Sequence, residues 1–296
     1  MKLAIIIVMV VIVLIVVGIL VIYHDTHSFI VRRYEINTSK IKGDYTFVFL
    51  TDLHSYTFGE ENKRLISAID DLDPDVILCG GDMFIARKIK GELDAETGAH
   101  LLCELAKKRP VYAANGNHEE KIKLYTKEYN NFFDRYRSRL QRAGVIYLEN
   151  QSVDIEGKNI RISGLDLDLD YFQKVTKKKM EPELMALKLG NMNMAEKNKL
   201  QVLIAHNPIY FEEYAKWGAD VTVSGHVHGG IVRLPFLGGV ISPAITLFPK
   251  YSGGKYELDG HTMILSCGLG THTIHVRIFN PGEVSLIKIR GVMDVT

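Results

Sequence analysis

The chain begins with an apolar run, residues 3–22, which constrains its fold more than any other feature of the sequence. These 20 residues contain no charged or amide side chain, and Gly18 is the only glycine among them. As a helix, the run would be about 30 Å long, which matches the hydrocarbon core of a bilayer. We therefore expect a single-pass helix that anchors the chain in a cell membrane.

A cleaved secretory signal peptide is the main alternative for this segment. Signal peptides usually have an apolar region of about 7–15 residues, followed by a cleavage site with two small residues. The run here is longer, and residues 23–27 (YHDTH) offer no such site. A helix buried in a protein core is a more distant alternative. The side of the membrane on which the rest of the chain lies stays open, because the tail before the run is too short for a count of basic residues to decide it.

The remainder of the chain has the composition of a folded domain. Residues 23–28 are predicted to be a linker, so we divide the chain into an anchor with its linker, 1–28, and one domain, 29–296. Over the whole chain, 47% of the residues are hydrophobic and 24% are charged, which is typical of globular proteins. The formal net charge is +1, so we expect no nucleic-acid partner, and we infer no protein partner.

Short apolar runs and amphipathic segments alternate along this domain. Helices are predicted at 61–72, 92–108, 122–143 and 183–194. Strands are predicted at 45–51, 76–79, 110–114, 145–148, 153–155, 160–163, 202–205, 221–224, 262–266, 275–279 and 284–289. The alternation indicates an α/β sandwich in which helices cover the sheets. The closely spaced strands 153–155 and 160–163 indicate mixed rather than purely parallel sheets.

Polar motifs directly follow five of the predicted strands. In chain order they are Asp52-Leu53-His54, Gly80-Gly81-Asp82, Asn115-Gly116-Asn117-His118-Glu119, His206-Asn207-Pro208 and Gly225-His226-Val227-His228-Gly229-Gly230. In open α/β sheets, chemistry gathers in the loops beyond the carboxyl ends of the strands. Asp, His and Asn are oxygen and nitrogen ligands for divalent ions, and the absence of cysteine argues against a structural zinc knuckle.

Each motif alone has an ordinary explanation. A Gly-Asp pair after a strand is usually a turn, Asn-Gly-Asn is usually a loop, and His-Asn-Pro can start a helix. The ordered set of five is what favours a metal site. One carboxylate can bridge two ions, and two ions about 3.5–4 Å apart can hold the attacking and leaving oxygens of a phosphoryl displacement.

The order D-x-H, GD, GNH[E/D], H-x-P, GHxH resembles that of the calcineurin-like metallophosphoesterase family, over residues 45–289. The chain is more closely similar to the membrane-associated YkuE/YaeI-type branch. That similarity rests on Gly218-Ala219-Asp220, Leu234-Pro235-Phe236, Leu247-Phe248-Pro249-Lys250-Tyr251 and Gly268-Leu269-Gly270-Thr271. Glu119 stands where the family also has Asp, and Ile231 stands where the branch often has Gln. No ligand position is missing.

The resemblance implies a four-layer α/β/β/α sandwich of mixed sheets and a site with two divalent metal ions, Mn, Fe or Zn. It implies that Asp52, His54 and His228 hold one ion, that Asn117, His206 and His226 hold the other, and that Asp82 bridges both. His118 would bind no metal; it would stabilise the transition state and protonate the leaving oxygen.

The expected substrate is a phosphodiester or pyrophosphate. The expected anchor favours one that is linked to a lipid, and the resemblance implies a UDP-diacylglucosamine-like lipid as one candidate. We expect residues 229–260 to line its groove with Pro235, Phe236, Phe248 and Tyr251; simple packing over the sheet edge is the alternative. Lys174 and Lys177–Lys179 form a basic cluster that is either a solvated face or a contact for anionic lipid headgroups. Three other functions stay open: a general phosphomonoesterase, a non-catalytic metal-binding scaffold and a two-metal hydrolase of other bonds.

Overall fold

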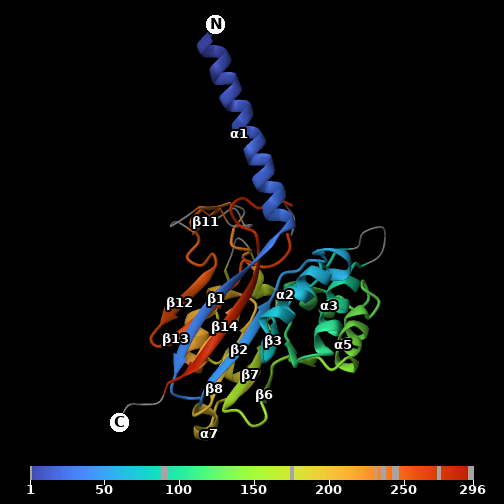
Figure 1. Cartoon of the computed structure of the whole chain (residues 1–296). Coiled ribbons are helices and arrows are strands. Elements are labelled where there is room, and N and C mark those ends of the chain that lie inside the picture. Colours follow the sequence, from blue (N-terminus) through green and yellow to red (C-terminus); the bar gives the residue numbers. More distant parts are fainter. Residues whose placement is uncertain are drawn as a thin grey trace.

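The computed structural model describes residues 2–87, 93–173, 177–230, 232–234, 238–241, 247–271 and 275–292. A long helix, α1 (Lys2–His27), projects from a domain in which two six-stranded sheets pack face to face between outer helices (Figure 1). The expected four-layer α/β/β/α sandwich is therefore confirmed.

Both sheets are mixed, as expected. The first has the order β1-β14-β2-β3-β4-β5, with the bounds β1 (Phe29–Thr38), β14 (Gly282–Gly291), β2 (Asp44–Leu50), β3 (Val76–Cys79), β4 (Val111–Ala113) and β5 (Ile146–Tyr147). The second has the order β12-β13-β9-β8-β7-β6, with the bounds β12 (Gly254–Leu258), β13 (His261–Leu265), β9 (Val221–Ser224), β8 (Leu200–Ala205), β7 (Ile160–Leu165) and β6 (Gln151–Asp154).

The layers follow from the alternation of side chains along the strands. On β2, Phe47 and Phe49 lie in the core between the two sheets, whereas Val48 and Leu50 pack toward the outer helices. Those helices are α2 (Lys63–Leu72), α3 (Glu96–Ala106) and α5 (Phe132–Arg142). The outer face of the second sheet packs against α6 (Leu184–Leu189) and α8 (Phe211–Trp217).

Two predicted helices are each divided in the structure. The helix expected over 122–143 is α4 (Asn117–Leu124) followed by α5, and before α5 both Asn130 and Asn131 have a positive φ. The helix expected over 183–194 is α6 followed by α7 (Met194–Lys197), with Gly190 at φ +79° between them. Asparagine tolerates the left-handed conformation and glycine any positive φ, and neither conformation continues a helix; Gly190 ends α6, and Asn131 precedes the first residue of α5, whereas α4 already ends at Leu124.

The strand predictions also need correction in places. The segment 275–279 is described throughout and forms no strand; only Ile278 makes an isolated bridge, to Val232. The stretch 229–260, in which no helix or strand was predicted, contains β10 (Val232–Leu234), β11 (Gly238–Ile241) and β12. The strand β1 was not predicted; it pairs with β14 in parallel.

Helix α1 continues to His27, through the segment expected to be a linker. Its residues 3–20 are exposed, and α1 is the helix among the described residues that is long and apolar enough to cross a membrane. Phe29, separated from α1 by Ser28 alone, pairs with Gly282 at the start of β14, and β14 runs antiparallel to β2. The carboxyl end of β2 therefore lies at the same end of the sheet as the base of α1 (Figure 1).

Candidate metal centre

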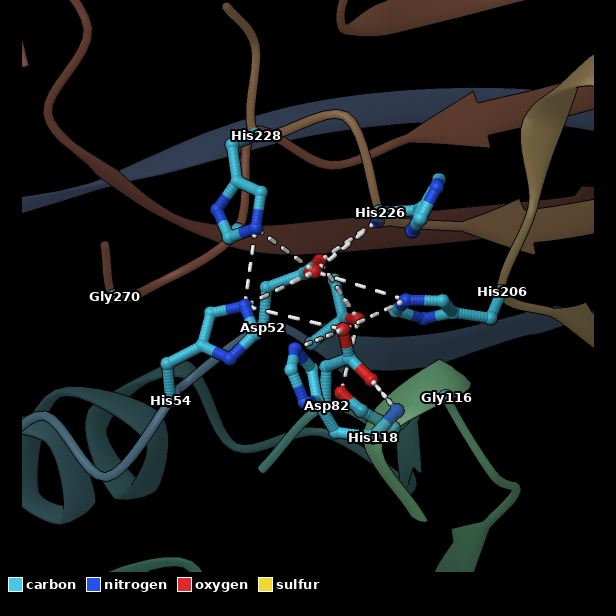
Figure 2. A network of polar contacts seen from close by, with 12 residues as sticks. Asp52, His54, Asp82, Gly116, His118, His206, His226, His228 and Gly270 are labelled. Carbon is cyan, nitrogen blue, oxygen red and sulfur yellow. Dashed lines mark hydrogen bonds and ion pairs between the residues drawn. The ribbon is translucent and has the colours of Figure 1, made fainter. Parts of the chain in front are cut away.

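The polar motifs of five strand ends meet in one place. Asp52 and His54 follow β2, Asp82 follows β3, Asn117 and His118 begin α4 after β4, His206 follows β8, and His226 and His228 follow β9. Figure 2 shows the two carboxylates between the imidazoles of His54, His118, His206 and His228. Residues up to 176 positions apart in the sequence thus share one buried site, which the parallel arrangement of these strands makes possible.

The first group of possible ligands consists of Asp52, His54 and His228. The Nε2 atoms of His54 and His228 lie 3.0 Å apart. Asp52 Oδ1 lies 3.8 Å from His54 Nε2 and 3.4 Å from His228 Nε2. Two nitrogens and one carboxylate oxygen therefore face a common point, as a divalent ion requires.

The second group consists of Asp82, His206 and His226, whose ligand atoms lie within 4.8 Å of one another. His206 Nε2 lies 3.2 Å from Asp82 Oδ2. The same Oδ2 atom lies 3.9 Å from His54 Nε2, in the first group. Asp82 is thus the carboxylate between the two groups.

Asn117 adds an oxygen to this arrangement. Its Oδ1 atom is buried, and among the described residues it accepts no hydrogen bond. Leaving a buried acceptor unsatisfied costs about 1–3 kcal/mol. Asn117 lines the same pocket as Asp82 and His226, so a cation there would satisfy this oxygen. The residues present therefore fit divalent metal ions.

Hydrogen bonds fix which ring nitrogen faces the site. His206 Nδ1 lies 2.7 Å from the carbonyl oxygen of Gly80, so Nδ1 carries a hydrogen and Nε2 is the nitrogen that faces Asp82, available to a metal ion once its own proton is displaced. His118 has the opposite tautomer, because its Nδ1 accepts from the backbone N–H of Ala86 at 2.8 Å. In the neutral ring, His118 therefore carries its hydrogen on Nε2, which lies 3.9 Å from Asp82 Oδ2.

Charge and burial oppose each other in this site. Burial alone would raise the pKa of Asp82, but the imidazoles of His206 and His118 hold it well below its ordinary value. Burial raises the pKa of Asp52 to about 6. His206 behaves conversely: burial lowers its pKa, but Asp82 and Asp52 outweigh burial and raise it to about 9. Burial lowers the pKa of His118. It also lowers the pKa of His226, to about 3.

The backbone at the site is held in an unusual conformation. Asp52, His54, Asp82, His226 and His228 all have φ between +50° and +72°. Side chains other than glycine adopt this region rarely and at a cost, and such residues cluster at functional sites. The backbone at Gly225 also approaches Asp52 so closely that only glycine fits, because a Cβ atom there would lie 2.2 Å from Asp52 Oδ2.

Glu119 has a role in the site that the sequence did not reveal. Its buried carboxylate accepts hydrogen bonds from the backbone N–H groups of Asp82, Met83 and Gly116. These bonds tie together two turns, one that carries Asp82 and one that carries Asn117. The signal was present: Glu119 is the third residue of α4, where an acidic side chain commonly bonds the backbone N–H of the helix cap.

A pocket of about 530 Å³ opens over the site. His54, Asp82, Asn117, His118, His226 and His228 form its polar floor. Of the expected substrate contacts, Phe248 and Tyr251 line this pocket, whereas Phe236 and Pro235 lie outside the described residues. Lys177, Lys178, Lys179 and Lys250 also line it, and Lys174 lies outside the described residues.

Comparisons with known proteins identify the family of the chain. The model of the "Calcineurin-like phosphoesterase" family matches residues 45–230. An "Uncharacterized metallophosphoesterase" of Aquifex aeolicus (strain VF5) is 27% identical over 90% of this chain and 94% of its own length. "Phosphodiesterase YaeI" of Escherichia coli (strain K12) is 27% identical over 83% of this chain and 82% of its own. "Uncharacterized metallophosphoesterase YkuE" of Bacillus subtilis (strain 168) is 22% identical over 83% and 79%.

Proposed function

The chain belongs to the calcineurin-like phosphoesterase family and is a metal-dependent phosphoesterase, and on that premise we propose that it uses two divalent ions to cleave a phosphodiester or pyrophosphate bond. The family and branch expected from the sequence are confirmed by the family match and by the relatives YaeI and YkuE. The number of ions, the bond and the residue roles are part of the proposal.

In this proposal Asp52, His54 and His228 would hold one ion, and Asn117, His206 and His226 would hold the other. Asp82 would be shared between the two. The observation that carries the assignment is the position of Asp82 Oδ2, 3.2 Å from His206 Nε2 in one group and 3.9 Å from His54 Nε2 in the other. When bound, two such ions supply a water nucleophile of lowered pKa and offset the charge that develops on the phosphoryl oxygens.

The chain's own residues supply the rest of the chemistry. His118 lies at the start of α4, with Nε2 directed to the site and Nδ1 held by the Ala86 backbone. A hydrogen on Nε2 is suited to bond a phosphoryl oxygen and then to protonate the leaving oxygen. The lysines that line the pocket attract the anionic substrate.

We also propose that the substrate is linked to a lipid, for which a UDP-diacylglucosamine-like lipid is one candidate, and that α1 anchors the catalytic domain to the membrane. Two features support this. The site lies at the edge of the first sheet from which α1 projects, so a membrane around α1 would lie on the same side as the pocket. Phe172, Phe248 and Tyr251 give that pocket an apolar wall beside its lysines.

The test uses the full-length chain in detergent with Mn²⁺. We expect metal-dependent hydrolysis of bis-p-nitrophenyl phosphate that is faster than hydrolysis of p-nitrophenyl phosphate. A clear preference for the monoester would contradict a diesterase and favour a general phosphomonoesterase. Bound metal without turnover of either ester or of a UDP-diacylglucosamine-like lipid in mixed micelles would contradict catalysis and favour a binding role.

A further inference from the structure

The last turn of α1 is part of the folded domain. Asp25 is only 6% exposed, although residues 3–20 of the same helix are exposed. Its Oδ2 atom accepts a hydrogen bond of 2.9 Å from the backbone N–H of Asn280, and its Oδ1 atom lies 3.0 Å from His24 Nδ1. A buried carboxylate at this point ties the helix to the segment that leads into β14.

Asn280 also contacts the loop that carries His228. It is fully buried, and its side-chain Nδ2 donates to the carbonyl oxygens of His228 at 2.8 Å and Gly230 at 2.7 Å. One residue therefore joins α1, through its backbone, to the His228 loop, through its side chain.

A second set of hydrogen bonds leads from Asn280 to Asp52. The buried guanidinium of Arg277 donates to the carbonyl oxygens of Asn280, Gly268 and Gly270. Gly270 in turn donates its backbone N–H to the carbonyl oxygen of Asp52 at 2.7 Å, and Figure 2 shows it beside the site. The backbones that carry Asp52 and His228 thus depend on the same buried contacts.

We propose that Asp25 is a positioning residue for the ion site of Asp52, His54 and His228, acting through Asn280. The inference rests on the proposed metal-binding role of His228. A chain cut at the expected boundary between residues 28 and 29 would lack the carboxylate that holds Asn280. Outer partners of metal ligands affect affinity because they fix the orientation of those ligands.

The experiment is a Mn²⁺ titration of the full-length protein in detergent, which gives the dissociation constant of each ion independently of activity. In Asp25→Ala we expect one constant to rise about tenfold, within the range typical of lost outer partners, and the other to stay unchanged. Asp25→Asn retains an oxygen that can accept from Asn280 and should bind both ions nearly as the wild type does.

The matched control is Asp220→Ala. Asp220 also accepts from a backbone N–H, that of Gln201 at 2.7 Å, and from Lys40, but it lies just before β9, at the opposite edge of the second sheet. We expect this variant to lower the melting temperature of the metal-free protein without changing either ion affinity.

Unchanged affinities for both ions in folded Asp25→Ala would overturn the proposal. Should Asp25→Ala fail to fold, Asn280→Ser is the second test, because it keeps the backbone N–H and removes the two hydrogen bonds from Nδ2. We expect the same loss of affinity for one ion. Unchanged affinities for both ions would again overturn the proposal. A wild-type chain that binds no ion would instead contradict the proposed function itself.

Discussion

His54 Nε2 and His228 Nε2 lie 3.0 Å apart, although the two residues are 174 positions apart in the sequence. Each belongs to a different sheet, since His54 follows β2 and His228 follows β9. Asp52 Oδ1 lies within 3.8 Å of both nitrogens. This convergence across the sandwich is the geometric basis for a shared ion, and it leads to the predictions below.

Replacing the carboxylate between the two groups should affect both ions. Asp82→Asn removes the charge that would be shared between them, so we expect the metal content of the purified protein to fall from two ions to one or none per chain. Elemental analysis of the purified variant measures this. Asp220→Asn, which alters a carboxylate remote from the site, should retain both ions. An Asp82→Asn protein with two tightly held ions would rule out a bridging role.

His118→Asn should retain both ions and lose turnover. General acid catalysis typically contributes about 10²–10⁴ in rate, and the loss should be larger for a phenyl or alkyl ester than for a nitrophenyl ester, whose leaving oxygen needs less protonation. The measurement is kcat for this leaving-group series. His261→Asn serves as control, because His261 bonds the Ala219 carbonyl away from the site. An equal loss for every leaving group would contradict the acid role.

The binding of metal should depend on pH through His206. Its pKa in the metal-free protein is about 9, above the value of about 6.5 in an unfolded chain, so pairing with Asp82 and Asp52 contributes stability that is fully present below pH 6.5. That contribution is lost as the pH rises through 9. We therefore expect the melting temperature of the metal-free protein to fall between pH 6.5 and 9. Ion affinity should rise over the same interval, because binding displaces the proton.

Calorimetry in buffers of different ionisation enthalpy measures the proton released per ion at each pH. His206→Asn should remove most of the pH dependence of metal-free stability. Ion affinity that stays constant from pH 6.5 to 9 in the wild type would contradict this assignment.

Replacing Phe248 should affect the hydrolysis of lipid-linked substrates only. Its side chain is 63% exposed and lines the pocket, so covering it with an acyl chain would remove apolar surface from water. We expect Phe248→Ala to raise KM about tenfold for a lipid-linked pyrophosphate and to leave hydrolysis of bis-p-nitrophenyl phosphate unchanged. Leu187→Ala, which shortens an exposed side chain on α6, is the control. An equal effect on both substrates would show that Phe248 does not contact an acyl chain.

The sequence predicted the strands that carry the site because each is an apolar run that ends at a polar motif. Val76–Cys79 and Val221–Ser224 were predicted to the residue. A shared site at their carboxyl ends was expected because chemistry in α/β sheets gathers beyond those ends, although these two strands belong to different sheets. The breaks at Asn130, Asn131 and Gly190 were missed because helical periodicity continued across them.

What the sequence could not provide depends on contacts between distant segments. Nothing local distinguishes Asp25 from an exposed residue of a membrane helix; its burial follows from Asn280, 255 positions later. The bond from the Gly116 N–H to Glu119 could be expected from the helix start, but the N–H groups of Asp82 and Met83 reach Glu119 from a separate turn. The tautomers of His118 and His206 depend on Ala86 and Gly80, which belong to other loops.

The most direct test of the account is to add Mn²⁺ stepwise to metal-free, full-length protein while measuring both bound ions and hydrolysis of bis-p-nitrophenyl phosphate. A two-ion phosphoesterase predicts saturation at two ions per chain, with turnover that appears only as the second ion binds. Full turnover with one ion bound, or turnover that persists after chelation has removed all metal, would contradict it.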